Sequence, residues 1–147
     1  MLQIKKRHLP HWTQEGAAYF ITFNIAATDL NPREILIVRD HIAAGHNKFY
    51  RLYALQVMSS HVHMIIRPKE GYALSRIMNG IKGITSRLVN QNRGAMGHLW
   101  REESYDRIIR NEPELLEKMK YMYENPVKAG IVDDGANYPG WFAPENG

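Results

Sequence analysis

The sequence contains no cysteine, which excludes disulfide bonds, thiolate metal sites and a cysteine nucleophile. It also has no apolar run near the ~20 residues that span a bilayer, and no apolar signal core follows the basic segment at 1–12. No repeat, low-complexity tract or linker interrupts the 147 residues. With an apolar fraction of 44%, these absences lead us to expect one soluble, cytoplasmic globular domain.

Acidic residues are slightly outnumbered by basic ones, and the formal net charge is +4. Clustered lysine and arginine side chains bind phosphates, so nucleic acid is a natural partner for such a chain. The excess is mild and is not gathered in a basic tail. Charge alone therefore leaves the partner open.

Patterns of apolar and β-branched residues predict seven elements in the order β-α-β-β-α-β-α. Asn31 is the expected N-cap of the first helix, with Pro32 at its first position. Pro126 is expected to end the last helix at Asn125, and the tail at 135–147 is expected to be irregular. The predicted strands are 18–26, 50–58, 61–67 and 104–111, and the predicted helices are 32–47, 73–90 and 112–125.

The first six elements follow the split βαβ order of the ferredoxin-like fold, a four-stranded antiparallel sheet with two helices on one face. We therefore predict an α+β domain of this type with an added C-terminal helix. Gly80 and Gly83 lower the helix propensity of the segment at 73–90. They suggest close approach of that helix to the sheet or to the backbone of a ligand.

Residues 57–68 read VMSSHVHMIIRP and place two histidines in a strand that is otherwise apolar. Side chains alternate between the faces of a strand, so His61 and His63 share one face. Their ring nitrogens can converge on one divalent ion. A structural interpretation stays open, in which His61 caps the turn and His63 is a hydrogen-bonded core residue.

The last helix presents a tyrosine on the side that does not pack. At 100° per residue, its apolar side chains fall on one arc, while Tyr121 falls on the opposite arc with Asn125 one turn later. Burial does not explain a tyrosine among polar groups, although an exposed aromatic residue without a role would look the same. Tyr123 lies on the apolar arc and is expected to pack in the core.

These segments together resemble the single-tyrosine transposases of the HUH class (histidine, hydrophobic residue, histidine), and more narrowly the REP-associated tyrosine transposases of bacteria. The family usually has Pro-Asn before the histidine motif, where this chain has Ser59-Ser60. A short polar turn is still possible with serine. The segments that carry the resemblance are RHLPHWTQEGAAYFITF at 7–23, SSHVHMIIRP at 59–68, LSRIMNGIKGITSRL at 74–88, LWREESYDRIIRNEPEL at 99–115 and YMYENPVKAGIV at 121–132.

The resemblance implies a role for each residue of the candidate site. Tyr121 is the expected nucleophile, and His61, His63 and Asn125 are the expected ligands of Mg²⁺ or Mn²⁺. The family's fold is the ferredoxin-like sheet, with the catalytic helix carrying its tyrosine over the histidine strand. The implied product is a 5′-phosphotyrosine link to DNA, with release of a free 3′-OH.

The implied substrate is single-stranded or hairpin DNA with a short palindromic repeat. No small-molecule cofactor and no membrane is expected, and a monomer is favoured over a homodimer that exchanges tyrosine helices. Basic side chains are expected to follow the DNA backbone and an aromatic one to stack on a base. The candidates are Lys5, Lys6, Arg7, Lys82, Arg87, Arg101 and Lys128, with Trp100 for stacking.

Two alternatives remain open at this stage. One is a non-catalytic nucleic-acid-binding module with a sheet like that of the RRM, although the strands lack the aromatic motif of that domain. The other is a metal-dependent phosphodiester hydrolase in which an acid such as Glu103 joins the two histidines. The hydrolase would cleave DNA without forming a covalent adduct.

Overall fold

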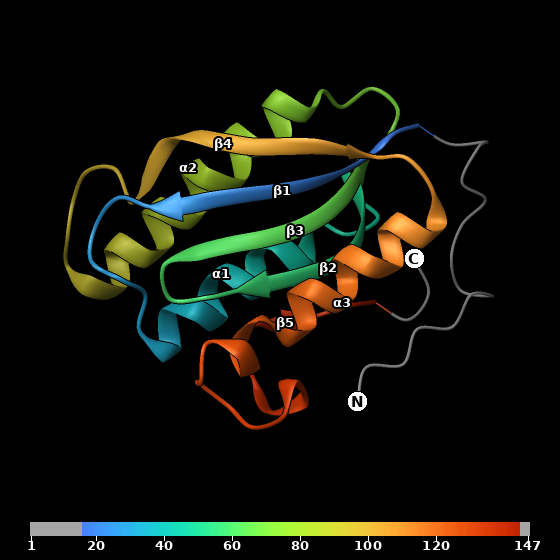
Figure 1. Cartoon of the computed structure of the whole chain (residues 1–147). Helices are drawn as coiled ribbons and strands as arrows, with labels where there is room; N and C mark the ends of the chain where they lie inside the picture. The colour runs from blue at the N-terminus through green and yellow to red at the C-terminus, as the bar shows by residue number, and fades with distance from the viewer. Residues whose placement is uncertain (1–15, 145–147) are drawn as a thin grey trace.

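The computed structural model describes residues 16–144 as a five-stranded antiparallel sheet with helices on both faces (Figure 1). Helices α1 and α2 cover one face, and α3 crosses the other. The elements are β1 (Ala18–Ile25), α1 (Pro32–Ala44), β2 (Tyr50–Val57), β3 (His61–Pro68), α2 (Leu74–Arg93), β4 (Trp100–Ile109), α3 (Glu112–Lys128), a 3₁₀ turn η3 (Gly135–Asn137) and β5 (Trp141–Phe142).

The strand order is β4-β1-β3-β2-β5. The first four strands have the predicted ferredoxin-like arrangement, so the α+β fold class is confirmed. The fifth strand corrects the expectation of an irregular tail. Its position depends on Gly140, because a Cβ there would collide with the Val57 carbonyl. The main-chain N–H of Val57 donates to the Gly140 carbonyl at 3.0 Å, which fixes β5 beside β2.

Alternation along the strands divides the interior into two cores. Val62, Met64 and Ile66 of β3 face α1 and α2, whereas Ile65 faces α3. The core under α3 is the smaller of the two. It contains Ala18, Tyr53, Ala54, Ile65, Ile109, Leu115, Met119 and Met122. Both cores are apolar, and burial of this surface is the main driving force for the fold.

Helix α1 begins as predicted. The Asn31 side chain accepts a hydrogen bond from the main-chain N–H of Glu34 at 2.9 Å, and the Glu34 carboxylate accepts from that of Asn31 at 3.0 Å. This reciprocal capping box satisfies two N–H groups that the helix leaves without partners. The Glu34 carboxylate also makes contacts at the end of α2.

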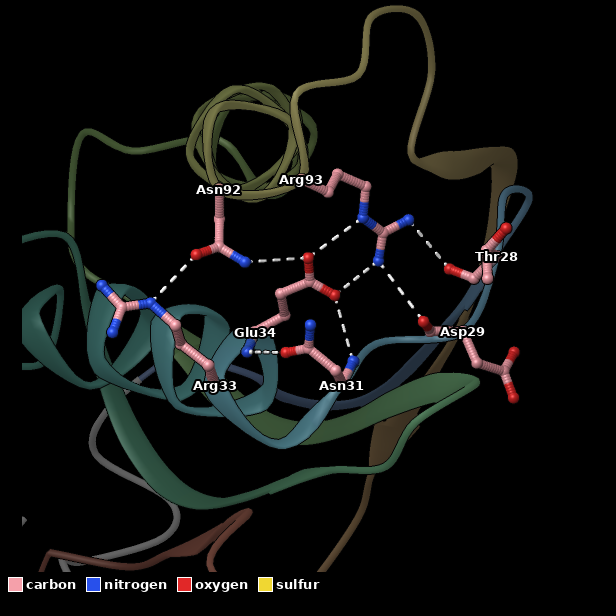
Figure 2. Close-up of polar contacts among 7 residues, drawn as sticks. All are labelled: Thr28, Asp29, Asn31, Arg33, Glu34, Asn92 and Arg93. Carbon is pink, nitrogen blue, oxygen red and sulfur yellow. Dashed lines mark hydrogen bonds and ion pairs between the residues drawn. The ribbon is translucent and has the colours of Figure 1, made fainter.

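The carboxylate of Glu34 also binds Arg93 in the last turn of α2 (Figure 2). The two charged groups lie 2.6 Å apart, and only 2% of the Glu34 side chain is exposed. Arg93 also donates to the carbonyls of Thr28 and Asp29, at 3.0 and 3.4 Å. Asn92 adds a hydrogen bond to the carboxylate at 3.1 Å. One buried carboxylate thus ties together both helices and the loop after β1.

Helix α2 does not approach the sheet through its glycines. A Cβ built at Gly80 or Gly83 would meet no atom within 4 Å, so packing does not require glycine at either position. Not all apolar side chains of α2 are buried. Ile84 is 37% exposed, whereas Val89 is fully buried.

Four boundaries differ from the sequence prediction by three residues or more, and one of them is the end of α2, which lies at Arg93 rather than at 90. Helix α1 ends at Ala44, three residues early, and Asn47 in the following turn has a positive φ of 67°. Strand β4 begins at Trp100 rather than at 104. The apolar pattern did not indicate this start, because the first residues of the strand are charged and lie on an exposed edge of the sheet. Helix α3 continues through Pro126 to Lys128. Among the described residues, no helix is long and apolar enough to cross a membrane.

We predict that the Glu34 contacts make stability depend on pH in the acidic range. The hydrogen bond from Arg93 lowers the pKa of Glu34 from 4.5 to about 2. This stabilisation is present above pH 4.5 and is lost as the pH falls toward 2, by about 3 kcal/mol. Urea unfolding of the wild type and of Glu34→Gln from pH 7 to 2 measures it.

The difference in unfolding free energy between these two proteins should shrink by that amount across the acidic range. Asp40→Asn is the matched control, since Asp40 is an exposed acid of the same helix. Its difference from the wild type should change little with pH. A Glu34→Gln difference that stays constant with pH would contradict the assignment.

Candidate active site

Two imidazole rings from β3 lie side by side on the sheet face that α3 covers. The ring centroids of His61 and His63 are 4.7 Å apart, and the ring planes meet at 72°. His63 is buried, with 7% of its surface exposed, and His61 is half-buried. The predicted shared face is therefore present.

Each imidazole has a hydroxyl group against its Nδ1 atom. Thr22 Oγ1 lies 2.8 Å from His63 Nδ1, and Ser60 Oγ lies 2.9 Å from His61 Nδ1. When the rings donate from Nδ1, both Nε2 lone pairs are left for another electrophile. Outer contacts of this kind fix the orientation of metal-binding histidines. Ser60, one of the two serines before the histidine motif, thus has a structural role.

The surroundings keep the imidazole pair neutral. Burial lowers the pKa of His63 to about 4, and the nearby His61 adds to this effect. Burial also lowers the pKa of His61, while a hydrogen bond with the Asn125 side chain and the charge of Asp29 oppose the change. Neutral rings are the form that binds metal ions.

Helix α3 brings its tyrosine to this pair within one chain. The Tyr121 and His63 ring centroids are 5.8 Å apart, and Tyr121 is 43% exposed. Asn125, one turn later, hydrogen-bonds with His61. Tyr123 is buried against Trp141, at 5.1 Å between ring centroids, as expected for the apolar arc. The helix therefore presents one tyrosine to solvent beside the imidazoles and packs the other.

Phe20 of β1 forms the floor between these groups. Its ring stacks on His63 at 5.4 Å and meets Tyr121 edge-on at 6.5 Å. The Lys118 ammonium lies 5.5 Å from the same ring. Lys118 precedes Tyr121 by three residues, so both side chains lie on one side of α3. A positive charge therefore stands close to the tyrosine.

Gln56 explains why α3 continues through Pro126. A proline has no N–H, so the carbonyl of Met122 loses its usual partner in the helix. Gln56 Nε2 donates to that carbonyl at 2.9 Å from the neighbouring strand β2. Gln56 pairs with His63 in the sheet register. The same contact that permits the proline thus fixes the C-terminal part of α3 beside the imidazoles.

The donor set fits a divalent cation of the Mg²⁺ or Mn²⁺ type. His61 and His63 offer two Nε2 atoms, and Asn125 offers an amide oxygen, all of them neutral. Within residues 16–144, no group of three or more histidine, cysteine, aspartate or glutamate side chains is placed to hold a metal ion. Glu103, the acid of the hydrolase alternative, therefore does not join the histidines.

Two of the predicted DNA contacts make hydrogen bonds within the protein, one from a buried and one from a half-buried side chain. Trp100 is 5% exposed and donates from Nε1 to Thr85 Oγ1 at 2.9 Å, so it is a core residue and not a stacking surface. Lys82 Nζ donates to two main-chain carbonyls at the start of β4 and to Ser104 Oγ, at 2.7 to 3.0 Å. Because its protons are engaged, Lys82 holds the edge strand to α2.

The other candidates differ in their relation to the imidazole pair. Lys128 is exposed in the last turn of α3, one turn beyond Asn125. Arg101 is exposed on β4, and Arg87 is exposed on α2, which covers the opposite face of the sheet. Lys5, Lys6 and Arg7 lie outside the described residues. Only the exposed positions are free to meet a DNA backbone.

Comparison with known families supports the sequence interpretation. A family model described as "Transposase IS200 like" matches residues 33–121, more than half of the chain. The chain belongs to the IS200-like transposase family. The resemblance to single-tyrosine transposases is thereby confirmed. Comparison with curated protein sequences gives no match.

Two solved structures share the fold of this transposase. One is a REP-associated tyrosine transposase bound to a REP hairpin, with a TM-score of 0.70 and 21% identity over 96% of this chain and 82% of that one. The other is a putative transposase from Deinococcus radiodurans R1, with a TM-score of 0.51 and 15% identity over 80% of this chain and 96% of that one.

Sequence reasoning missed five residues around the imidazoles: Phe20, Thr22, Gln56, Ser60 and Lys118. The alternation in β1 already placed Phe20 and Thr22 on one face. Which face this is, and which residues of β3 lie opposite, depends on the sheet register. Lys118 could have been found from its helical spacing to Tyr121.

We predict that Gln56 and Pro126 are energetically coupled. Gln56→Met removes the donor to the buried Met122 carbonyl and should lower the free energy of unfolding by about 1–3 kcal/mol. Adding Pro126→Ala restores a main-chain N–H that reaches the same carbonyl, so most of the loss should be recovered. Urea unfolding of both single variants and of the double variant measures the coupling. Strictly additive effects would contradict this contact.

Proposed function

We propose that this transposase is a metal-dependent single-strand DNA endonuclease and strand transferase with Tyr121 as its nucleophile. One observation carries the proposal: the Tyr121 ring lies 5.8 Å from the His63 ring, on a side of α3 that is open to solvent. A phosphate group approaching from solvent can meet the phenol and the imidazole pair together. Membership of the family, which acts on DNA by transposition, supports the choice of substrate.

The proposed reaction exchanges one phosphoester for another. The bond from Tyr121 Oη to phosphorus forms as the bond from phosphorus to the 3′ oxygen breaks. Phenols are mostly protonated at neutral pH, so the phenolic proton passes to water as the bond forms, and the leaving 3′ oxygen takes up a proton. The DNA is then held through a 5′-phosphotyrosine, and the ester energy is kept for rejoining to another 3′-OH.

The other residues of the site hold the reacting groups in place. His61, His63 and Asn125 would bind Mg²⁺ or Mn²⁺, which when bound would supply the positive charge that polarises the phosphate. Thr22 and Ser60 orient the two imidazoles through Nδ1. The Lys118 ammonium adds positive charge on the side of the tyrosine. No small-molecule cofactor is needed for this chemistry.

We propose hairpin-forming repeat DNA with an adjacent single strand as the substrate, read by a monomer in the cytoplasm. The similar REP-associated transposase is bound to a REP hairpin, and its fold covers 96% of this chain. A monomer is favoured because Tyr121 and both imidazoles come together within one chain.

The two alternatives make different predictions. A binding module without catalysis gives Tyr121 no role, and its position beside the imidazoles would then be unexplained. A hydrolase needs an acid beside the histidines, and the described residues provide no such group of three. Both alternatives predict that DNA never becomes attached to the protein.

We predict that Tyr121→Phe abolishes covalent attachment to DNA. The wild type, incubated with labelled hairpin oligonucleotides and Mn²⁺, should form a protein–DNA adduct that survives a denaturing gel. Removal of the phenol oxygen removes the nucleophile, so the adduct should fall by at least a thousandfold.

Tyr105→Phe is the matched control, because Tyr105 is also exposed and lies opposite Thr22 in the sheet. It should form the adduct as the wild type does. Cleavage without an adduct would favour the hydrolase, and binding alone would favour the module.

We predict that His61 and His63 bind the divalent metal ion. His63→Ala removes one of three proposed donors and should weaken Mn²⁺ binding at least tenfold, measured by isothermal titration calorimetry without DNA. His41→Ala, at a histidine of α1 on the other face of the sheet, should bind Mn²⁺ as the wild type does. Equal affinities in the two variants would place the ion elsewhere.

A further inference from the structure

A second site lies on the face of the molecule that α1 and α2 cover, away from the imidazoles. We propose that this pocket binds one unpaired base of the DNA substrate. The identity of the ligand rests on the proposed function, whereas the pocket itself is a separate feature of the fold. Along β3, the distance from His61 to Pro68 near this pocket is about 23 Å. A base bound there would belong to a different part of the DNA from the phosphate at Tyr121.

The pocket has the size and walls that suit a planar aromatic ligand. Its volume is about 480 Å³, and it lies between the end of α1, the start of β2 and the middle of α2. Phe49 and Tyr72 stand at it with ring centroids 5.4 Å apart and planes at 76°. They are 45% and 37% exposed, respectively. Exposed aromatic rings are the surfaces on which unpaired bases stack.

The polar groups of the pocket favour a ligand with phosphate attached. Lys48 and Arg76 line it, together with His41, and none of its lining residues is acidic. Burial lowers the pKa of the His41 imidazole, and the positive charge of the nearby Arg87 lowers it further. A base that enters this pocket brings its own backbone phosphates to these cations. A neutral apolar peptide would leave their charge without a partner.

Gly80 is the observation that points to a ligand. A glycine inside a helix costs about 1 kcal/mol of helix stability relative to alanine. Packing gives no reason here, since a Cβ at Gly80 meets nothing within 4 Å. Gly80 instead forms part of the pocket wall, where any side chain would fill the space. The glycine keeps the pocket open at the expense of the helix.

Gly83 supplies the matched control within the same helix. It also meets nothing within 4 Å, but it does not line the pocket. Gly80→Leu and Gly83→Leu should therefore both raise the melting temperature, because leucine is the better helix former. Only Gly80→Leu should fill the pocket. The pair separates loss of the site from any change in the helix.

The experiment uses the full chain and single-stranded 24-mers of random sequence in which 5-iodouracil replaces thymine. Irradiation couples this base to aromatic side chains in contact with it, and mass spectrometry identifies the peptide. We expect crosslinks to Phe49 or Tyr72 in the wild type and in Gly83→Leu. In Gly80→Leu the yield should fall at least fivefold, and the affinity measured by fluorescence anisotropy should fall about tenfold, as for loss of one stacked base.

Crosslinks confined to other residues, or unchanged binding in Gly80→Leu, would overturn the proposal. If Gly80→Leu loses its cooperative unfolding transition, Tyr72→Leu replaces it under the same criteria. Adduct formation at Tyr121 is measured in parallel on the same protein preparations with labelled hairpin oligonucleotides and Mn²⁺. An adduct without crosslinks at the pocket refutes the pocket alone, and crosslinks without an adduct refute the catalytic function alone.

Discussion

One row of residues across the sheet holds the candidate site together. Tyr105, Thr22, His63, Gln56 and Trp141 lie opposite one another on the five strands in turn. Thr22 orients the imidazole from one side, and Gln56 fixes helix α3 from the other. A slip of one residue in the pairing of β3 would turn His63 to the opposite face. The register of this central strand is therefore the constraint on which the site depends.

The two faces of the sheet differ in the size of their cores and in what they leave exposed. The face under α3 has the smaller core, and Tyr121 is exposed to solvent there beside the buried His63. The face under α1 and α2 has the larger core, closed at one end by the buried contact of Glu34 with Arg93 (Figure 2). The aromatic pocket lies on that face too. The proposed chemistry on one side and the proposed base pocket on the other would give a single small domain two distant contacts with DNA.

Local pattern was enough for the first seven elements and for the faces of His61, His63 and Tyr121. The two-residue period of a strand places His61 and His63 together, and the 3.6-residue period of a helix separates Tyr121 from Tyr123. Prediction failed where a residue distant in sequence determines the environment of a side chain. Trp100 was predicted to stack on a base, yet it is buried and donates to Thr85, while the half-buried Lys82 donates to carbonyls of β4.

Pro126 is the clearest example of such a distant partner. Read locally, a proline ends the helix, because it lacks an N–H and disfavours helical backbone before it. In the folded chain, Gln56 supplies the missing donor from a strand 66 positions away in sequence, and the helix continues. Nothing in the local sequence indicates this contact.

The sequence by itself determined the order of the first seven elements, the shared face of the two histidines and the outward arc of Tyr121. These depend on backbone periodicity and on the hydrophobic pattern, which act over a few residues. Only the tertiary structure decided that the tyrosine arc meets the histidine face, which hydroxyls orient the rings, and which basic side chains stay free. Each of these depends on strand register and helix docking, because they join residues that are far apart along the chain.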